Sequence, residues 1–85
     1  MDVSFASRFI KQFNKLPDKS QQRFNSRLKL FMSDQHHVLL RRHALKGKYA
    51  GYYSIDISGD LRAVFRYNSR GSVIFSLIGT HSQLY

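Results

Sequence analysis

The spacing of the apolar residues changes partway along this chain of 85 residues, and that change constrains the fold more than any other feature. In the N-terminal part, apolar residues recur every three or four positions, which places them on one face of a helix. They are Phe5, Phe9, Phe13 and Leu16, followed by Phe24, Leu28 and Phe31. After Gly47, apolar residues alternate with polar ones, as in a strand with one buried face. Helices followed by strands are typical of an α+β domain.

Pro17 divides the helical part into two segments. The pattern predicts a first helix over about Ser4 to Lys15 and a second over about Pro17 to Ser33. Asp18 is then well placed near the positive end of the second helix. Three basic residues of this helix lie at four-residue steps, and we expect them to face solvent without a catalytic role: Lys19, Arg23 and Arg27.

The C-terminal part predicts three strands. Tyr53 to Ser58 and Leu61 to Tyr67 form a hairpin around the Gly59-Asp60 turn, and a second turn at Asn68 to Gly71 leads into Ser72 to Gly79. The last strand is almost continuously apolar, which favours a central position in the sheet. We therefore expect one domain, residues 1–85, with two helices packed on one face of a small, mostly antiparallel sheet.

The charge of the chain limits its partners. Fourteen lysine and arginine residues against five aspartates give a net charge of +9, and there is no glutamate. Such a density favours a nucleic acid or an acidic protein as partner, although a solubilising surface is the plain alternative. The chain has no cysteine and no apolar run long enough to span a bilayer. These features predict a soluble, cytoplasmic protein that has no membrane partner.

Side chains suited to RNA cleavage gather in the second half of the chain. Without a metal, cleavage requires deprotonation of the 2′-hydroxyl, stabilisation of the phosphate and protonation of the leaving oxygen. The residues available for this are His43, Asp60, Arg62, Arg66, His81 and Tyr85. On the second strand, Arg62 and Arg66 share the face opposite the predicted core residues, so they could hold a phosphate together or pair with Asp56 or Asp60.

No cofactor or metal site is expected. His36 and His37 are neighbours without an acidic or histidine cluster nearby, so a pair of loop residues is the better interpretation.

Three motifs resemble a known family. They are His-x-Leu-x-Gly at His43 to Gly47, Gly-Asp-Leu-Arg at Gly59 to Arg62, and Ile-Gly-Thr-His-Ser-x-Leu-Tyr at Ile78 to Tyr85. With the order of helices and strands, they are similar to the RelE/ParE superfamily of bacterial type II toxins, and most similar to its YafQ-like branch. The resemblance implies a RelE/ParE-like fold and a ribosome-dependent endoribonuclease, an mRNA interferase, that cuts translated mRNA. It also implies a cognate antitoxin, for which an acidic and partly disordered protein would suit the basic surface.

The resemblance also implies roles for individual residues. It matches His43, Asp60, His81 and Tyr85 to site residues of the YafQ-like branch, and Arg62 to a phosphate-contacting arginine of RelE-like members. In the resulting hypothesis His81 is the general acid and either His43 or Asp60 is the general base. Arg62, Arg66 and Lys46 would stabilise the phosphate, and Tyr85 would stack on a base.

The chain departs from the branch at Asp56, where a histidine is expected, and at Leu61, where a tryptophan is common. Two other functions remain open. ParE-like members share the fold but inhibit DNA gyrase without a nuclease site, and a basic RNA-binding domain would bind RNA without cutting it.

Overall fold

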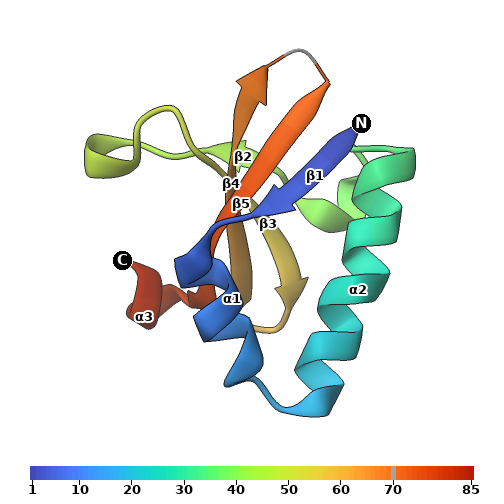
Figure 1. The fold of residues 1–85 in the computed structure, drawn as a ribbon, viewed down its shortest axis with the longest axis vertical. Helices are drawn as coiled ribbons and strands as arrows, with labels where there is room; N and C mark the ends of the chain where they lie inside the picture. The colour runs from blue at the N-terminus through green and yellow to red at the C-terminus, as the bar shows by residue number, and fades with distance from the viewer. Residues whose placement is uncertain (70) are drawn as a thin grey trace.

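A computed structural model describes residues 1–69 and 71–85 of the chain (Figure 1). The elements of this described part follow in the order β1 (Asp2–Phe5), α1 (Ser7–Asn14), α2 (Asp18–Ser33), η1 (Val38–Leu40), β2 (His43–Ala44), η2 (Gly47–Tyr49), β3 (Tyr53–Ser58), β4 (Leu61–Ser69), β5 (Ser72–Thr80) and α3 (His81–Leu84). The two η elements are single 3-10 turns on either side of the short strand β2.

The strands form one five-stranded sheet in the order β1-β5-β4-β3-β2. β1 runs parallel to β5, and the other neighbours are antiparallel. The expected mostly antiparallel sheet with two helices is therefore confirmed. β5 lies inside the sheet between β1 and β4, in agreement with its continuous apolar sequence.

One face of the sheet packs against α1 and α2 and forms the main core. Phe9 of α1 and Phe24 and Phe31 of α2 are buried there against Phe65 and Phe75 of the sheet. The rings of Phe24 and Phe75 meet edge to face with their centroids 5.5 Å apart, a favourable geometry for aromatic pairs. Leu61 and Ala63 are buried in the same core, as the period-two pattern of β4 predicted, whereas Tyr67 remains exposed.

The opposite face of the sheet carries a second, smaller apolar cluster. Val64, Leu77 and Leu84 are buried in it, and Leu45, Tyr49 and Tyr52 pack against them. Among the described residues this face has no helical layer comparable to α1 and α2, since the only helical elements that contribute to the cluster are η2, with Tyr49, and the four-residue α3, with Leu84. It is therefore the face on which polar side chains of the sheet can remain accessible.

The ends of the chain differ from the sequence-based prediction. The first helix starts at Ser7, and the residues before it form β1, whose pairing with β5 involves partners about 70 positions away in sequence. Phe5 was expected in the helical stripe and instead pairs with Phe75 across the two strands. The C-terminal residues form α3, which was not predicted. β4 continues to Ser69, so the turn expected at Asn68 to Gly71 is shorter; its residue Arg70 lies outside the described residues.

Side-chain bonds hold the helices to one another and to the sheet. Pro17 directly precedes α2, and Gln21 donates from Nε2 to the carbonyls of Phe13 (3.0 Å) and Leu16 (3.2 Å), which closes the turn between α1 and α2. The Oε1 atom of Gln12 accepts from the backbone N–H of Ile78 at 2.9 Å, beyond the point where β1 stops pairing with β5. In the described part of the chain, no helix is both long and apolar enough to cross a membrane.

Candidate active site

A surface cavity of about 330 Å³ lies on the open face of the sheet. It is lined by His43, Leu45, Lys46, Tyr49, Ser54, Arg62, His81 and Tyr85. The structure thus brings together five of the residues that the sequence proposed, and they come from β2, the following loop, β4 and the C-terminal helix. We call this space the histidine cavity.

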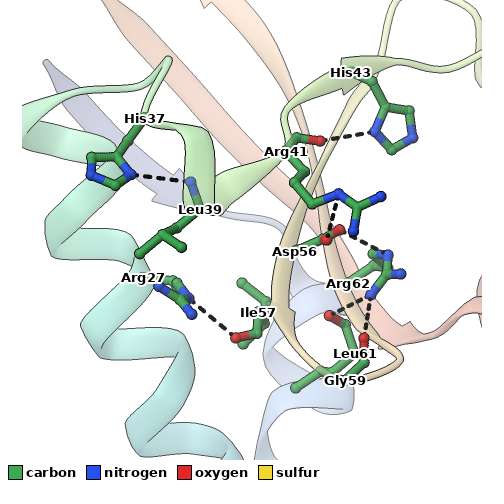
Figure 2. A network of polar contacts seen from close by, with 10 residues as sticks. All are labelled: Arg27, His37, Leu39, Arg41, His43, Asp56, Ile57, Gly59, Leu61 and Arg62. Atoms are coloured by element: carbon green, nitrogen blue, oxygen red, sulfur yellow. Dashed lines mark hydrogen bonds and ion pairs between the residues drawn. The ribbon is translucent and has the colours of Figure 1, made fainter.

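Arg62 is held in a fixed orientation by its own hairpin (Figure 2). Its Nε atom lies 3.0 Å from Oδ1 of Asp56, the cross-strand neighbour on β3. Its Nη1 atom donates to the carbonyls of Gly59 at 2.9 Å and Leu61 at 3.3 Å. A guanidinium carries five N–H donors, so within the described residues the two donors on Nη2 are left for an anion.

Asp56 also pairs with a second arginine. Its Oδ2 atom lies 3.5 Å from Nε of Arg41, whose side chain is 78% exposed (Figure 2). The sequence left open whether Arg62 binds phosphate or pairs with an aspartate, and the structure shows the pair with Asp56. The pairing leaves Nη2 available because the described residues form no hydrogen bond to that nitrogen.

His43 lines the cavity, and one of its ring nitrogens is bonded to the backbone. Its Nδ1 atom lies 3.1 Å from the carbonyl oxygen of Arg41 (Figure 2). A carbonyl oxygen can only accept, so Nδ1 carries the hydrogen, and Nε2 of the neutral imidazole is an acceptor. His43 pairs across β2 and β3 with Ser54, which places both side chains on the same face of the sheet.

The C-terminal helix positions His81 and Tyr85. Thr80 caps α3 in both directions: its Oγ1 accepts from the N–H of Gln83 at 3.3 Å, and its own N–H donates to Oε1 of Gln83 at 2.8 Å. Gly79 allows this arrangement, since a Cβ atom there would lie 2.9 Å from Oε1 of Gln83. One turn apart on α3, the rings of His81 and Tyr85 meet at a centroid distance of 4.9 Å.

Three cavity residues, Leu45, Tyr49 and Ser54, were not identified as site residues from the sequence. Tyr49 packs edge to face on Tyr85, with centroids 5.9 Å apart, and donates its hydroxyl to the carbonyl of Leu84 at 3.2 Å. Ser54 is fully buried, and its hydroxyl has no partner among the described residues. The alternation along β3 could have indicated Ser54, because it shares a face with Asp56.

Two proposed residues do not line the histidine cavity. Asp60 is exposed in the turn between β3 and β4. Arg66 lies on the same face of β4 as Arg62 but lines a separate cavity. The hypothesis that Arg62 and Arg66 hold one phosphate together therefore has no support in this arrangement.

The chemistry available in the histidine cavity is acid–base chemistry on an anionic substrate. It combines two imidazoles with a guanidinium and the Lys46 side chain. Among residues 1–69 and 71–85, no group of three or more potential metal ligands gathers at one place. The aromatic rings of Tyr49 and Tyr85 add a surface on which a flat group can stack.

Comparison with known proteins identifies the family. All of residues 1–85 match the family model described as "Bacterial toxin of type II toxin-antitoxin system, YafQ". No curated protein matches the chain by sequence.

Solved structures show the same fold. YafQ from E. coli strain BL21(DE3) is similar with a TM-score of 0.82 and 15% identity over 99% of this chain and 97% of that chain. A YoeB/ParE toxin from Agrobacterium tumefaciens has a TM-score of 0.79 and 19% identity over 95% and 99% of the two chains. A RelB-RelE antitoxin-toxin complex from Methanococcus jannaschii has a TM-score of 0.76 and 23% identity over 98% and 95%. The chain belongs to the YafQ family and is the toxin of a type II toxin–antitoxin system, as its motifs predicted.

Proposed function

We propose that this toxin is a metal-independent endoribonuclease that cleaves mRNA on the ribosome. The observation that carries the proposal is the histidine cavity, in which His43, Arg62 and His81 converge from three separate elements beside Tyr85. Acid–base groups, a fixed cation and an aromatic ring are the parts that cleavage of an RNA phosphodiester needs.

In the proposed reaction His43 is the general base. The free Nε2 of its neutral ring accepts the proton of a ribose 2′-hydroxyl, and the 2′ oxygen attacks the neighbouring phosphorus. The bond from phosphorus to the 5′ oxygen then breaks, and His81 donates a proton to that oxygen. The products are a 2′,3′-cyclic phosphate and a 5′-hydroxyl end. Asp60, the alternative base, is exposed in the hairpin turn and does not line the cavity.

Arg62 and Lys46 stabilise the charge that builds on the phosphate during the attack. The Nη2 edge of Arg62 is oriented before substrate binds, because Asp56 and two carbonyls already hold the rest of the guanidinium. Tyr85, which is 45% exposed, stacks on a base next to the cleaved bond.

The proposed partners are the ribosome with its mRNA and a cognate antitoxin. The solved relatives include a DinJ-YafQ toxin-antitoxin complex from E. coli and the RelB-RelE complex, so toxins of this fold bind antitoxins. The net charge of +9 favours an acidic antitoxin. We expect the toxin to act in the cytoplasm, where translation occurs.

The test compares His81→Ala and a chain that lacks Tyr85 with the unchanged toxin. Message ends are mapped on translating ribosomes, and His36→Ala serves as the matched control because His36 is exposed in a loop outside the cavity. We expect a loss of at least a hundredfold for His81→Ala, a smaller loss without Tyr85, and none for the control. Cleavage that survives His81→Ala in a folded protein contradicts the proposal. Inhibition of gyrase supercoiling by the unchanged toxin, without message cleavage, would assign the ParE-like function instead.

A further inference from the structure

A second cavity lies beside the histidine cavity on the same face of the sheet. It has a volume of about 350 Å³ and is lined by Ala6, Arg8, Lys48, Tyr49, Tyr52, Arg66, Ile74, Ser76 and Leu77. Tyr49 lines both cavities. We call the second space the arginine cavity.

Three cations from distant parts of the chain converge on the arginine cavity. Arg8 comes from the first turn of α1, Lys48 from η2 and Arg66 from β4. No acidic side chain lines the cavity, and none of the three cations forms an ion pair with the described residues. Arg62, by contrast, is paired with Asp56. Three uncompensated cations around one hollow produce a strong local potential for an anion.

Aromatic and apolar side chains form the rest of the lining. The rings of Tyr49 and Tyr52 meet edge to face with centroids 6.1 Å apart, and Nζ of Lys48 lies 5.3 Å from the centre of the Tyr49 ring. A bulge between β4 and β5 gives β5 one extra residue, Ser76, which lines this cavity. Cations beside exposed aromatic faces are the combination that binds a phosphate and an unstacked base of single-stranded nucleic acid.

The spacing along β4 relates the two cavities. Arg62 and Arg66 are four residues apart on one face of a regular strand, so they are separated by about 13 Å. Stacked nucleotides are spaced about 3.4 Å apart and unstacked ones lie farther apart, so roughly two to four nucleotides span this distance. One strand of RNA can therefore enter both cavities without a change in the protein.

We propose that the arginine cavity binds a phosphate and base of the same single-stranded RNA, a few nucleotides from the bond that is cleaved. Arg66 and Lys48 contact the phosphate, with Arg8 at the rim, and Tyr52 stacks on the base. This inference extends the proposed nuclease function, because it gives the histidine cavity a second point that fixes the register of the RNA.

The test measures binding of RNA in which 2′-O-methyl groups prevent cleavage. Fluorescence anisotropy follows a labelled single strand of about 12 nucleotides, long enough for both cavities. Arg66→Gln and Lys48→Gln are compared with Lys19→Gln, which removes the same charge from an exposed position of α2 outside both cavities. Lys48 is also exposed, so its replacement keeps the test valid if Arg66→Gln disturbs the strand.

We expect Arg66→Gln and Lys48→Gln each to weaken binding of the long RNA about tenfold. Each should also reduce the slope of log K against log salt by about 0.7, the value for one phosphate contact on a single strand. Lys19→Gln should change binding of the same RNA by less than about twofold.

Equal losses for Arg66→Gln, Lys48→Gln and Lys19→Gln would overturn the inference. A weaker complex with the antitoxin, without weaker RNA binding, would assign the cavity to the acidic partner and overturn it too. The two proposals fail separately. If Arg66→Gln weakens binding of the long RNA but the unchanged toxin cuts no message, the nuclease function fails and the binding site remains. If the toxin cuts message but Arg66→Gln binds the long RNA as well as Lys19→Gln does, only this inference fails.

Discussion

Arg62 has most of its hydrogen-bonding capacity committed to the β3–β4 hairpin. Asp56 occupies its Nε, and the carbonyls of Gly59 and Leu61 occupy its Nη1 (Figure 2). An arginine that is already oriented loses little side-chain entropy when it binds an anion. We therefore infer that Asp56 is a positioning residue that acts through Arg62. The ion pair accounts for the location of the carboxylate without a role as proton acceptor.

We expect Asp56→Ala to reduce message cleavage about tenfold or more, because Arg62 would then point its Nη2 edge less precisely at the phosphate. The same change in an Arg62→Ala background should have almost no further effect. Arg41→Ala is the matched control, since Arg41 pairs with the same carboxylate from an exposed side chain. Cleavage rates of the four members of the cycle decide the point. If Asp56→Ala reduces cleavage in the Arg62→Ala background as much as it does in the unchanged toxin, the carboxylate acts independently of Arg62.

Ser54 is a buried polar residue on β3. Its side chain is fully buried, and its hydroxyl has no hydrogen-bond partner among the described residues. We expect Ser54→Ala to raise the free energy of unfolding by about 1 kcal/mol, because it removes an unsatisfied polar group. Urea denaturation gives the comparison with Ser58→Ala, which changes a half-buried serine of the same strand and should be nearly neutral. A less stable Ser54→Ala would mean that the hydroxyl makes a bond in solution.

At the scale of elements, local pattern predicted the long helix and the hairpin and failed at the ends of the chain. α2 and β3 agree closely with their expected ranges because each has a clear period and a turn signal at its boundary. β1 has only four residues, and its strand conformation depends on β5, so the spacing of Phe5 and Phe9 was mistaken for one helix. α3 is a single turn that begins at a cap, too short for any period to show.

The site could be predicted in residue type but only partly in geometry. His43, Lys46, Arg62, His81 and Tyr85 share a cavity as the motifs suggested. The alternation of β4 correctly placed Arg62 and Arg66 on one face. It did not show that the two arginines, four residues apart along the strand, line two different cavities. The role of Tyr49 depends on how η2 folds over the sheet, and no local signal in the sequence indicates that.

The single turn of α3 gives a prediction at the scale of an element. Gly79→Ala would place a Cβ atom 2.9 Å from Oε1 of Gln83, so the glutamine must leave its bond to the N–H of Thr80. We expect a loss of about 1 kcal/mol in stability, the usual value of a cap, and a much larger relative loss of cleavage, since His81 and Tyr85 lie on this turn.

Gln83→Ala supplies the comparison for Gly79→Ala, because it removes the cap without adding bulk. The two single variants should have similar effects, and the double variant should be no worse than either. Thermal unfolding and message cleavage are measured on all three. A double variant with additive losses would show that Gly79 matters for a reason other than the cap.

At the scale of the whole molecule, the two faces of the sheet have different tasks. The helical face contains the main core, which includes the four fully buried phenylalanines of the described residues, Phe24, Phe31, Phe65 and Phe75. The other face has a cluster of three buried side chains, and both cavities lie next to it. Most of the apolar burial that stabilises the fold is therefore separated from the residues proposed to bind RNA.

This separation predicts that stability and activity can be changed independently. Phe31→Leu alters the main core, and we expect it to lower the free energy of unfolding by about 1 to 2 kcal/mol while cleavage per folded molecule stays the same.

Leu84→Ala removes one of the three buried side chains that hold α3 to the sheet. Because α3 is a single turn whose one buried residue is Leu84, it can detach without global unfolding, so a large loss of cleavage should accompany only a small shift of the denaturation midpoint. Hydrogen exchange at the N–H of Tyr85, which bonds to the carbonyl of His81 at 2.9 Å, reports the detachment directly. If Phe31→Leu and Leu84→Ala lower activity in proportion to their losses of stability, the two faces form one cooperative unit and the separation does not hold.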